Sequence, residues 1–261
     1  MDRVGLVTSI RYDQLLLLSK ENANFAPPNR RPCPLYMLSY HRDRILAAAQ
    51  EIAREIPNLE GDRGLDAFAA QIHAHVAGAQ DDDEEALKVR FVVSPSGQIG
   101  VTSTKIPPVP QSALFPRALD DVLKAKPSFR IFISPIRTTP TFSTRHKTTD
   151  RSAYSQVRSV LPDEDDEDLP SEILMVNKKG DVMEGSITTP YFNHSGTWIT
   201  PAASSGGHLG VTKRWALERE LCDEGFVSMN SIQVGSLGER VILSNGARGF
   251  GWGRVEPLMA L

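Results

Sequence analysis

Cysteine is scarce in this chain, and long apolar runs are missing. Only Cys33 and Cys222 occur among the 261 residues, and neither belongs to a CxxC or a Cys/His spacing. A disulfide framework and a zinc site therefore have little support, and no metal ligands are expected. No uninterrupted apolar run approaches the roughly 20 residues that a membrane span needs. The first residues, MDRV, carry an acid where a signal peptide has basic residues, so a reduced, cytoplasmic compartment is expected.

An excess of charge of one sign is also missing. The chain has 29 lysines and arginines against 32 aspartates and glutamates, for a formal net charge of -3. This balance predicts neither a nucleic-acid partner nor an anionic membrane partner. With 40% hydrophobic and 23% charged residues the composition is that of a globular protein, and the length suggests one large or two modest domains.

The first half of the chain reads as a mixture of helices and strands. Apolar spacing predicts two short strands followed by two amphipathic helices: strands 4–12 and 35–39, helices 41–56 and 65–76. The alternation of Leu87, Val89, Phe91 and Val93 then predicts another strand, with a return strand at 99–102. The acidic run 81–85 is expected to be a solvated loop.

The second half has short apolar strands punctuated by glycine. A hairpin is predicted around 177–180, further strands at 198–200 and 241–243, and a helix at 212–222. Because residues 105–128 contain five prolines, a domain boundary is predicted near their end. The predicted organisation is a small N-terminal α+β domain (1–130), a linker (131–141) and a larger C-terminal domain (142–261).

Four short segments could carry chemistry, although each is ambiguous alone. Lys147 stands in the polar run HKTTDR, where a solvated surface lysine is the simple alternative, and Glu184 ends a predicted strand. The small-residue loop 204–212 runs into a predicted helix, so its backbone N–H groups and the helix dipole could hold an anion. The strand 241–243 runs into a tight turn at Asn245-Gly246, which could equally be an ordinary turn.

Taken in order, these segments resemble the class IV aminotransferase and aminodeoxychorismate lyase group, which are pyridoxal 5′-phosphate (PLP) enzymes of fold type IV. The resemblance is strongest from about 142 to 255, through HKTTDRSAY, EGSITTPYF, WITP, GGHLGVTKRWALE and LSNGARGF, and YHRDRIL at 40–46 is similar to the family's His-x-x-Arg-Leu helix. It implies a two-domain α+β fold, with a small α/β sandwich and a larger β-barrel-like domain with helices. It also implies PLP, a small-molecule amino substrate and a homodimer.

The resemblance assigns a role to each matching residue. Lys147 would bond to the cofactor's aldehyde and then act as a base, and Glu184 would face the pyridine nitrogen and keep it protonated. Arg44 would hold the phosphate as a fork of donors. The same phosphate is expected against the start of the helix at 210–212 and against the glycine turn, which together comprise Gly210, Val211, Thr212, Asn245 and Gly246.

Four further residues could contact the substrate: Arg11, Arg151, Tyr154 and Arg248. For the arginines a structural or solvated role is the alternative, and for Tyr154 the alternative is core packing. The chain also departs from the family pattern, since Thr8 and Ser9 replace an acid and a threonine of the first strand, and Thr189 stands where many relatives have asparagine. These departures concern the region that recognises the substrate in relatives.

Two reactions remain open, beside a PLP-binding protein without catalysis, against which the pair Lys147 and Glu184 argues. A lyase would eliminate pyruvate from 4-amino-4-deoxychorismate to give 4-aminobenzoate, a folate precursor. An aminotransferase would pass the amine to a second keto acid. The segments HKTTDRSAY, GSITTPYF and SNGARGF are more similar to the lyases, so the lyase is the preferred prediction.

Overall fold

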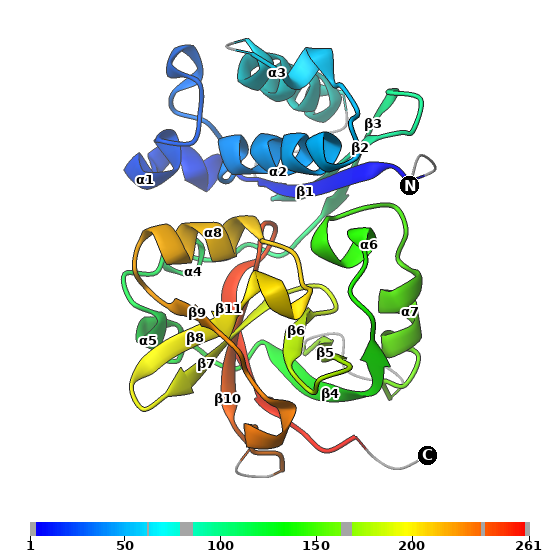
Figure 1. Ribbon diagram of the computed structural model, residues 1–261. Coiled ribbons are helices and arrows are strands. Elements are labelled where there is room, and N and C mark those ends of the chain that lie inside the picture. The colour runs from blue at the N-terminus through cyan, green and yellow to red at the C-terminus, as the bar shows by residue number, and fades with distance from the viewer. Residues whose placement is uncertain (1–3, 62, 79–85, 163–168, 236–237, 259–261) are drawn as a thin grey trace. The chain divides into compact units, whose positions relative to one another are not determined.

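The structure is a computed structural model, and it describes residues 4–61, 63–78, 86–162, 169–235 and 238–258. The chain divides into two compact units. Unit 1 consists of Met1–Gln111 with His146–Asp150, and unit 2 of Ser112–Arg145 with Arg151–Leu261. Both units contain helices and strands, which confirms the predicted α+β class (Figure 1). The acidic run 81–85 lies outside the described residues.

The division corrects the expected domain limits. The segment that was expected to be a linker, 131–141, lies largely within strand β4 (Phe129–Thr138) of unit 2. Pro135 obscured this strand, because a proline usually interrupts strand pairing. Here the register shifts between Ile133 and Arg137. The Ser134 hydroxyl donates to the Ile136 carbonyl at 3.0 Å, so Pro135 lies in an irregularity that does not require its missing N–H group.

Unit 1 is a three-stranded antiparallel sheet with helices on it. Strand β2 is buried at every second residue, which confirms the alternation predicted for Leu87 to Val93. Helix α2 packs against β1, and α3 packs against β3. The strand expected at 35–39 is wrong, because only Leu35 forms an isolated bridge, with Tyr12, and the chain then enters α2. The elements are β1 (Leu6–Tyr12), η1 (Gln14–Leu18), α1 (Lys20–Ala23), η2 (Pro28–Arg30), α2 (Leu38–Glu51), η3 (Pro57–Leu59), α3 (Gly64–Ala77), β2 (Leu87–Val93) and β3 (Ile99–Lys105).

Unit 2 contains one eight-stranded sheet in the order β6-β5-β4-β11-β10-β7-β8-β9. The sheet curls, because the residues after its last strand return to its first one: Val182 N donates to Val227 O at 2.8 Å, and Asp181 bridges to Ser228. This closure confirms the expected barrel-like form. The elements are α4 (Gln111–Leu114), α5 (Leu119–Val122), β4, α6 (Phe142–Arg145), α7 (Ser152–Arg158), β5 (Ser171–Asn177), β6 (Val182–Gly185), β7 (Thr189–His194), β8 (Thr197–Pro201), η4 (Ala203–Ser205), α8 (Val211–Glu218), β9 (Asp223–Gly225), η5 (Met229–Ser231), β10 (Arg240–Asn245) and β11 (Gly249–Val255).

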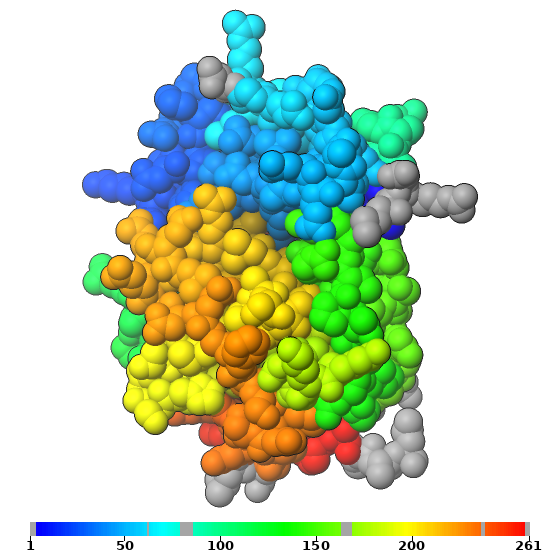
Figure 2. All heavy atoms as spheres, in the orientation of Figure 1, coloured from blue at the N-terminus to red at the C-terminus, as the bar shows by residue number. Residues whose placement is uncertain are grey.

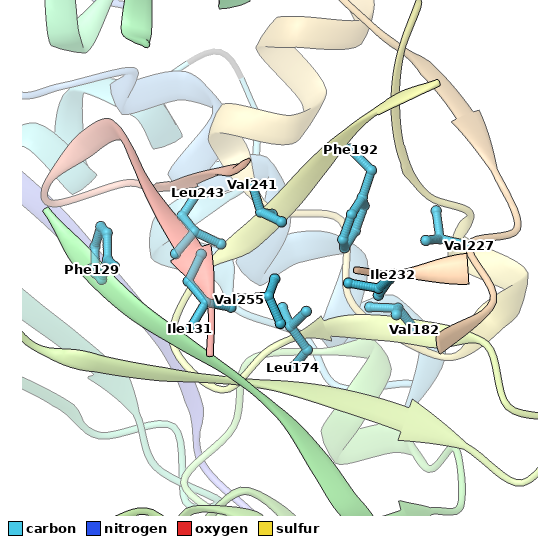
Figure 3. Packing of buried hydrophobic residues seen from close by; sticks show 10 residues of the cluster. All are labelled: Phe129, Ile131, Leu174, Val182, Phe192, Val227, Ile232, Val241, Leu243 and Val255. Carbon is cyan, nitrogen blue, oxygen red and sulfur yellow. The ribbon is translucent and has the colours of Figure 1, made fainter. Parts of the chain in front are cut away.

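The interior of the curled sheet is filled by aliphatic and phenyl side chains. Ten of them, contributed by β4 to β7, β10, β11 and the residues after β9, point toward one another (Figure 3). On the face that Figure 2 shows, segments coloured yellow and orange, including α8, form much of the surface of unit 2. None of the helices in the described part of the chain has the length and apolar character that crossing a bilayer requires.

Two valines of unit 2 test this core. Val241→Ala removes a fully buried side chain and should lower the free energy of unfolding by about 2 kcal/mol, through lost burial and the cavity left behind. Val234→Ala is the matched control, because Val234 is 49% exposed, and it should change that free energy by less than about 0.5 kcal/mol. Urea unfolding of both variants measures the difference. Equal costs would contradict the assignment of this core.

Candidate active site

Lys147 belongs to a short segment that pairs with the first strand of unit 1. Val7 N donates to Lys147 O at 2.9 Å, Thr149 N donates to Gly5 O at 2.9 Å, and Leu6 bridges to Thr148. On the preceding side, His146 Nε2 lies 2.6 Å from Glu51 Oε2 at the end of α2. The backbone of Lys147 is therefore fixed from both sides.

A polar cluster lies within unit 1 near this lysine. Thr8 on β1 contacts both His41 and Arg44 on α2, with 2.7 Å between Thr8 Oγ1 and His41 Nδ1, and Arg44 Nη2 donates to the same hydroxyl. The two helix residues are three positions apart, so their side chains share a face of α2. Burial first, then the charges of Arg44 and Lys147, lower the pKa of His41 well below its usual value. Burial alone lowers the pKa of Arg44 to about 10.

This cluster has donors that lack acceptors. Because His41 is neutral at neutral pH, its Nδ1 accepts the Thr8 hydroxyl hydrogen while Arg44 donates to the same oxygen, so the ring proton of His41 is on Nε2. His41 Nε2 and Arg44 Nε are buried and have no hydrogen-bond partner among the described residues. Buried donors of this kind usually indicate a ligand, a water or strain. In this case the unmatched charge is positive, so the cluster suits an anion.

In unit 2, the buried polar group of interest is the carboxylate of Glu184. Its side chain on β6 is 3% exposed, and Tyr154 OH from α7 donates to its Oε1 at 2.6 Å. His208 Nδ1 forms a close ion pair with Oε2, yet that oxygen accepts no well-aligned hydrogen bond from the described residues. His208 Nδ1 and Glu184 Oε2 therefore interact as a close ion pair and not as a well-aligned hydrogen bond. A ligand's N–H group that binds to Oε2 would have to replace this contact.

Tyr154 and Arg151 stack beside this carboxylate. The guanidinium of Arg151 lies 3.8 Å from the centroid of the Tyr154 ring, and its Nη2 donates to Ser186 O at 2.7 Å. Burial, together with the neighbouring Glu184, raises the pKa of Tyr154, so this hydroxyl stays a donor. Tyr154 was expected to be a substrate contact or a core residue. It is buried, and it positions Glu184.

The turn after Glu184 is held by a carboxylate that sequence reasoning missed. Glu172 on β5 is fully buried and accepts from Ser186 N, Ser186 Oγ and Ile187 N at 2.8, 2.6 and 3.1 Å, and from Thr188 Oγ1 at 2.6 Å. Burial raises the pKa of Glu172, and these hydrogen bonds oppose the rise. The sequence gives no indication that Glu172 would be buried and accept these hydrogen bonds, because a glutamate beside an apolar stretch is usually exposed.

The residues predicted to hold a phosphate lie at the start of α8. Gly210 is its N-cap, and no side chain caps this end, so its first N–H groups have no partner within the helix. Thr212 is buried, and its hydroxyl accepts from Ser244 Oγ at 2.7 Å. Since the Ser244 hydrogen is used there, Tyr191 OH donates to Ser244, 2.9 Å away. The Thr212 hydroxyl is also hydrogen-bonded to Tyr191, so the three hydroxyl groups form one buried cluster.

The remaining predicted residues have mostly structural positions. Asn245 Oδ1 accepts from Ala247 N and Arg248 N at 3.0 and 2.8 Å, so its side chain closes the turn that includes Gly246. Arg248 is exposed in that turn. Arg11 is fully buried, its Nε pairs with Asp13 Oδ2 at 2.7 Å, and its Nη2 donates to Pro107 O, so a structural role accounts for these contacts.

The comparisons with known proteins agree with this description. Residues 29–251 match the family model described as amino-transferase class IV, so the chain belongs to the class IV aminotransferase family. The aminodeoxychorismate lyase of Saccharomyces cerevisiae is 36% identical over 83 residues. That stretch covers 30% of this chain and only 21% of the yeast protein.

Solved structures of this family share the fold along nearly the whole chain. A branched-chain aminotransferase of Thermoproteus uzoniensis, with norvaline, matches with a TM-score of 0.65 and 16% identity, over 99% of this chain and 80% of that one. The 4-amino-4-deoxychorismate lyase of Pseudomonas aeruginosa matches with a TM-score of 0.62 and 17% identity, over 98% and 86%. At these identities the likeness concerns the fold, which is confirmed as that of PLP fold type IV.

The neutral, buried state of His41 predicts how stability depends on pH. Because the folded-state pKa lies below the unfolded value near 6.5, the unfolded chain binds the extra proton, and stability falls as the pH drops below about 6.5. The slope from this one group is at most about 1.4 kcal/mol per pH unit. His41→Asn, with no titrating ring, should lose correspondingly less stability between about pH 7.5 and about pH 5.

Urea unfolding at both pH values measures this, and His194→Asn, which alters an exposed histidine, is the control and should keep the wild-type dependence. An unchanged pH dependence in His41→Asn would contradict the assignment of a neutral His41.

Proposed function

We propose that this chain is a PLP-dependent lyase that eliminates pyruvate from 4-amino-4-deoxychorismate and leaves 4-aminobenzoate. The observation that supports the cofactor is that, among the described residues, the buried side-chain atoms without a hydrogen-bond partner include Nε2 of His41 and Nε of Arg44 in unit 1 and Oε2 of Glu184 in unit 2. The donors, on His41 and Arg44, suit a phosphate, and Glu184 Oε2 suits the protonated nitrogen of a heteroaromatic ring. PLP carries both groups.

Within each unit, the residues present suit one part of this cofactor. In unit 1, Arg44 and His41 supply charge and N–H groups that suit a dianion. In unit 2, the uncapped start of α8 supplies backbone N–H groups of the kind that phosphate groups bind. Glu184 Oε2 accepts no well-aligned hydrogen bond from the described residues, and a ring N–H group there would take the place of its contact with His208. Lys147 supplies the primary amine, on a backbone fixed to β1.

When bound, PLP supplies an aldehyde that bonds to amines and a ring that accepts the electron pair left when a neighbouring carbon loses its proton. Lys147 would be the residue that bonds to this aldehyde and, once the substrate amine has replaced it there, the free amine that takes the proton from the amine-bearing carbon. Glu184, oriented by Tyr154, accepts the ring N–H. In the proposed reaction this carbon loses its proton and the adjacent carbon loses the enolpyruvyl oxygen, so the ring becomes aromatic.

The support for the lyase over a transamination is local sequence similarity. Over 83 residues the chain is 36% identical to the yeast aminodeoxychorismate lyase. The energetics agree, because aromatisation makes the elimination strongly downhill, and a base with an electron sink is then sufficient.

A product assay separates the two reactions. Purified protein loaded with PLP is incubated with 4-amino-4-deoxychorismate, and separately with a panel of amino acids plus 2-oxoglutarate. We expect 4-aminobenzoate and pyruvate in equal amounts in the first reaction and no glutamate in the second. Glutamate without 4-aminobenzoate would identify an aminotransferase, and no product in either reaction would contradict both proposals.

The role of Lys147 has a chemical test that does not depend on the substrate. Borohydride reduction of the PLP-loaded protein should attach the cofactor to the peptide that contains Lys147, as peptide mass spectrometry would detect. Lys147→Ala should lose the label and lower turnover by about 10³-fold or more, because it removes the nucleophile and the base together. Lys124→Ala alters a lysine that is 78% exposed and should match wild type. A label on another lysine would refute the assignment.

A further inference from the structure

Glu184 is approached by a histidine as well as by a tyrosine, and the two come from different elements. Tyr154 on α7 donates to Oε1, whereas His208, in the loop between η4 and α8, lies against Oε2. The glutamate side chain is almost fully buried, while the histidine side chain is 16% exposed. The carboxylate is therefore shielded from water, but the imidazole can exchange its proton with solvent.

Close backbone packing brings the histidine to this position. A Cβ atom on Gly207 would lie 2.4 Å from Met183 O and 3.1 Å from Glu184 Cβ, so only glycine lets the loop approach β6 this closely. Gly206 has a φ of 109°, and a Cβ there would lie 2.5 Å from Pro140. Gly206 and Gly207 thus allow the loop to lie directly against β6, and this places the next residue, His208, in contact with the Glu184 carboxylate.

The other charged and titratable groups of unit 2 around this pair are Tyr154 and Arg151, with Glu172 and Arg158 acting on Arg151. Tyr154 keeps its proton because burial and Glu184 raise its pKa. The guanidinium of Arg151 stays charged and is occupied by Ser186 O and the Tyr154 ring. Among the groups that contact Glu184 in the described part of unit 2, the imidazole of His208 is the one that ordinarily changes charge near neutral pH.

We propose that His208 is a positioning residue that occupies Glu184 Oε2 in place of a ligand's ring N–H group. While no ligand is bound, the protonated imidazole compensates a buried carboxylate whose charge would otherwise be costly. When a cationic ring N–H group binds to Oε2, two cations would face one carboxylate, and the imidazole loses its proton to solvent. The inference rests on the proposed function, because the ring in question is that of PLP.

Ligand binding at this site is then linked to the release of a proton. The release occurs at any pH at which the imidazole of the ligand-free protein begins protonated. A histidine with a purely structural role would leave the proton count of binding unchanged.

The test uses pyridoxamine 5′-phosphate, which has the same ring and phosphate as PLP but no aldehyde to bond to Lys147. Titration calorimetry at about pH 6.5, in two buffers of different ionisation enthalpy, counts the protons released on binding. His208→Asn retains an N–H donor near the position of Nδ1 but does not titrate, so it should release fewer protons than wild type, by up to about one. His194→Asn, an exposed histidine of the same unit, should match wild type.

Protons from the ligand's own phosphate and ring contribute equally in all three proteins and cancel in the comparison. Equal proton release by wild type and His208→Asn would overturn the inference and leave the proposed function standing. No binding of pyridoxamine 5′-phosphate to any of the proteins would overturn both.

A second measurement uses the wild-type protein alone, so it does not depend on the folding of a variant. In wild-type protein labelled with ¹⁵N in its six histidine rings, nuclear magnetic resonance at about pH 6.5 reports the protonation of each imidazole. Addition of pyridoxamine 5′-phosphate should convert one ring from the protonated to the neutral form. If no ring changes, the proposed proton release is refuted.

Discussion

The backbone hydrogen bonds between β1 and residues 147–149 determine which unit carries the candidate nucleophile. The chain leaves unit 2 after Arg145 and returns to it at Arg151, and in between it pairs with the first strand of unit 1. Ordering such a segment costs about 1–2 kcal/mol per residue in backbone entropy. The hydrogen bonds of Lys147 and Thr149 offset this cost, and so does the contact between His146 and Glu51. As a result, the lysine side chain leaves from a fixed backbone, as covalent chemistry at a defined atom requires.

Charges without partners are the second constraint on the site. Each buried donor or acceptor that lacks a hydrogen bond costs about 1–3 kcal/mol, so natural proteins keep few of them. Unit 1 keeps two such donors, on His41 and Arg44, and the family's acid on β1 is replaced by Thr8, whose hydroxyl carries no charge. The absence of an acid leaves the arginine's charge uncompensated within the cluster. A dianionic group would compensate it, and the cost in the ligand-free protein becomes a gain in affinity.

The sequence predicted those helices and strands in which apolar residues recur with a clear helical or alternating spacing. The alternation in β2, the helix periodicity of α2 and α3 and the hairpin of β5 and β6 are all confirmed. Strand β4 was missed, because Pro135 reads as a break unless the bulge around it is known. Strands β7 and β11 were missed as well, since a glycine-rich stretch such as Gly249–Val255 has little β propensity of its own, and its pairing with β10 and β4 determines its structure.

The site was predictable as a set of residues but not as a set of contacts. The order of Lys147, Glu184 and the glycine loop carried the resemblance to the family, and Arg44 followed from its spacing to His41. No spacing rule relates Tyr154 or His208 to Glu184, because their contacts arise from the packing of α7 and of the loop before α8 against β6. The contacts of Arg11 were not predictable either, because a charged residue on a strand gives no sign that Asp13 and Pro107 are its partners.

The environment of Glu184 also bears on the reaction. A carboxylate that already accepts a hydrogen bond from Tyr154 is a weaker acceptor for a ring N–H group than one that faces the ring alone. A weaker acceptor holds the ring proton less firmly, and the ring then stabilises a neighbouring carbanion less. Transamination depends on that stabilisation in both directions, because its proton must be returned to a cofactor carbon. An elimination that ends in an aromatic ring gains its driving force from the product and tolerates a weaker sink. Under the proposed function, the hydrogen bond from Tyr154 to Glu184 is compatible with such an elimination.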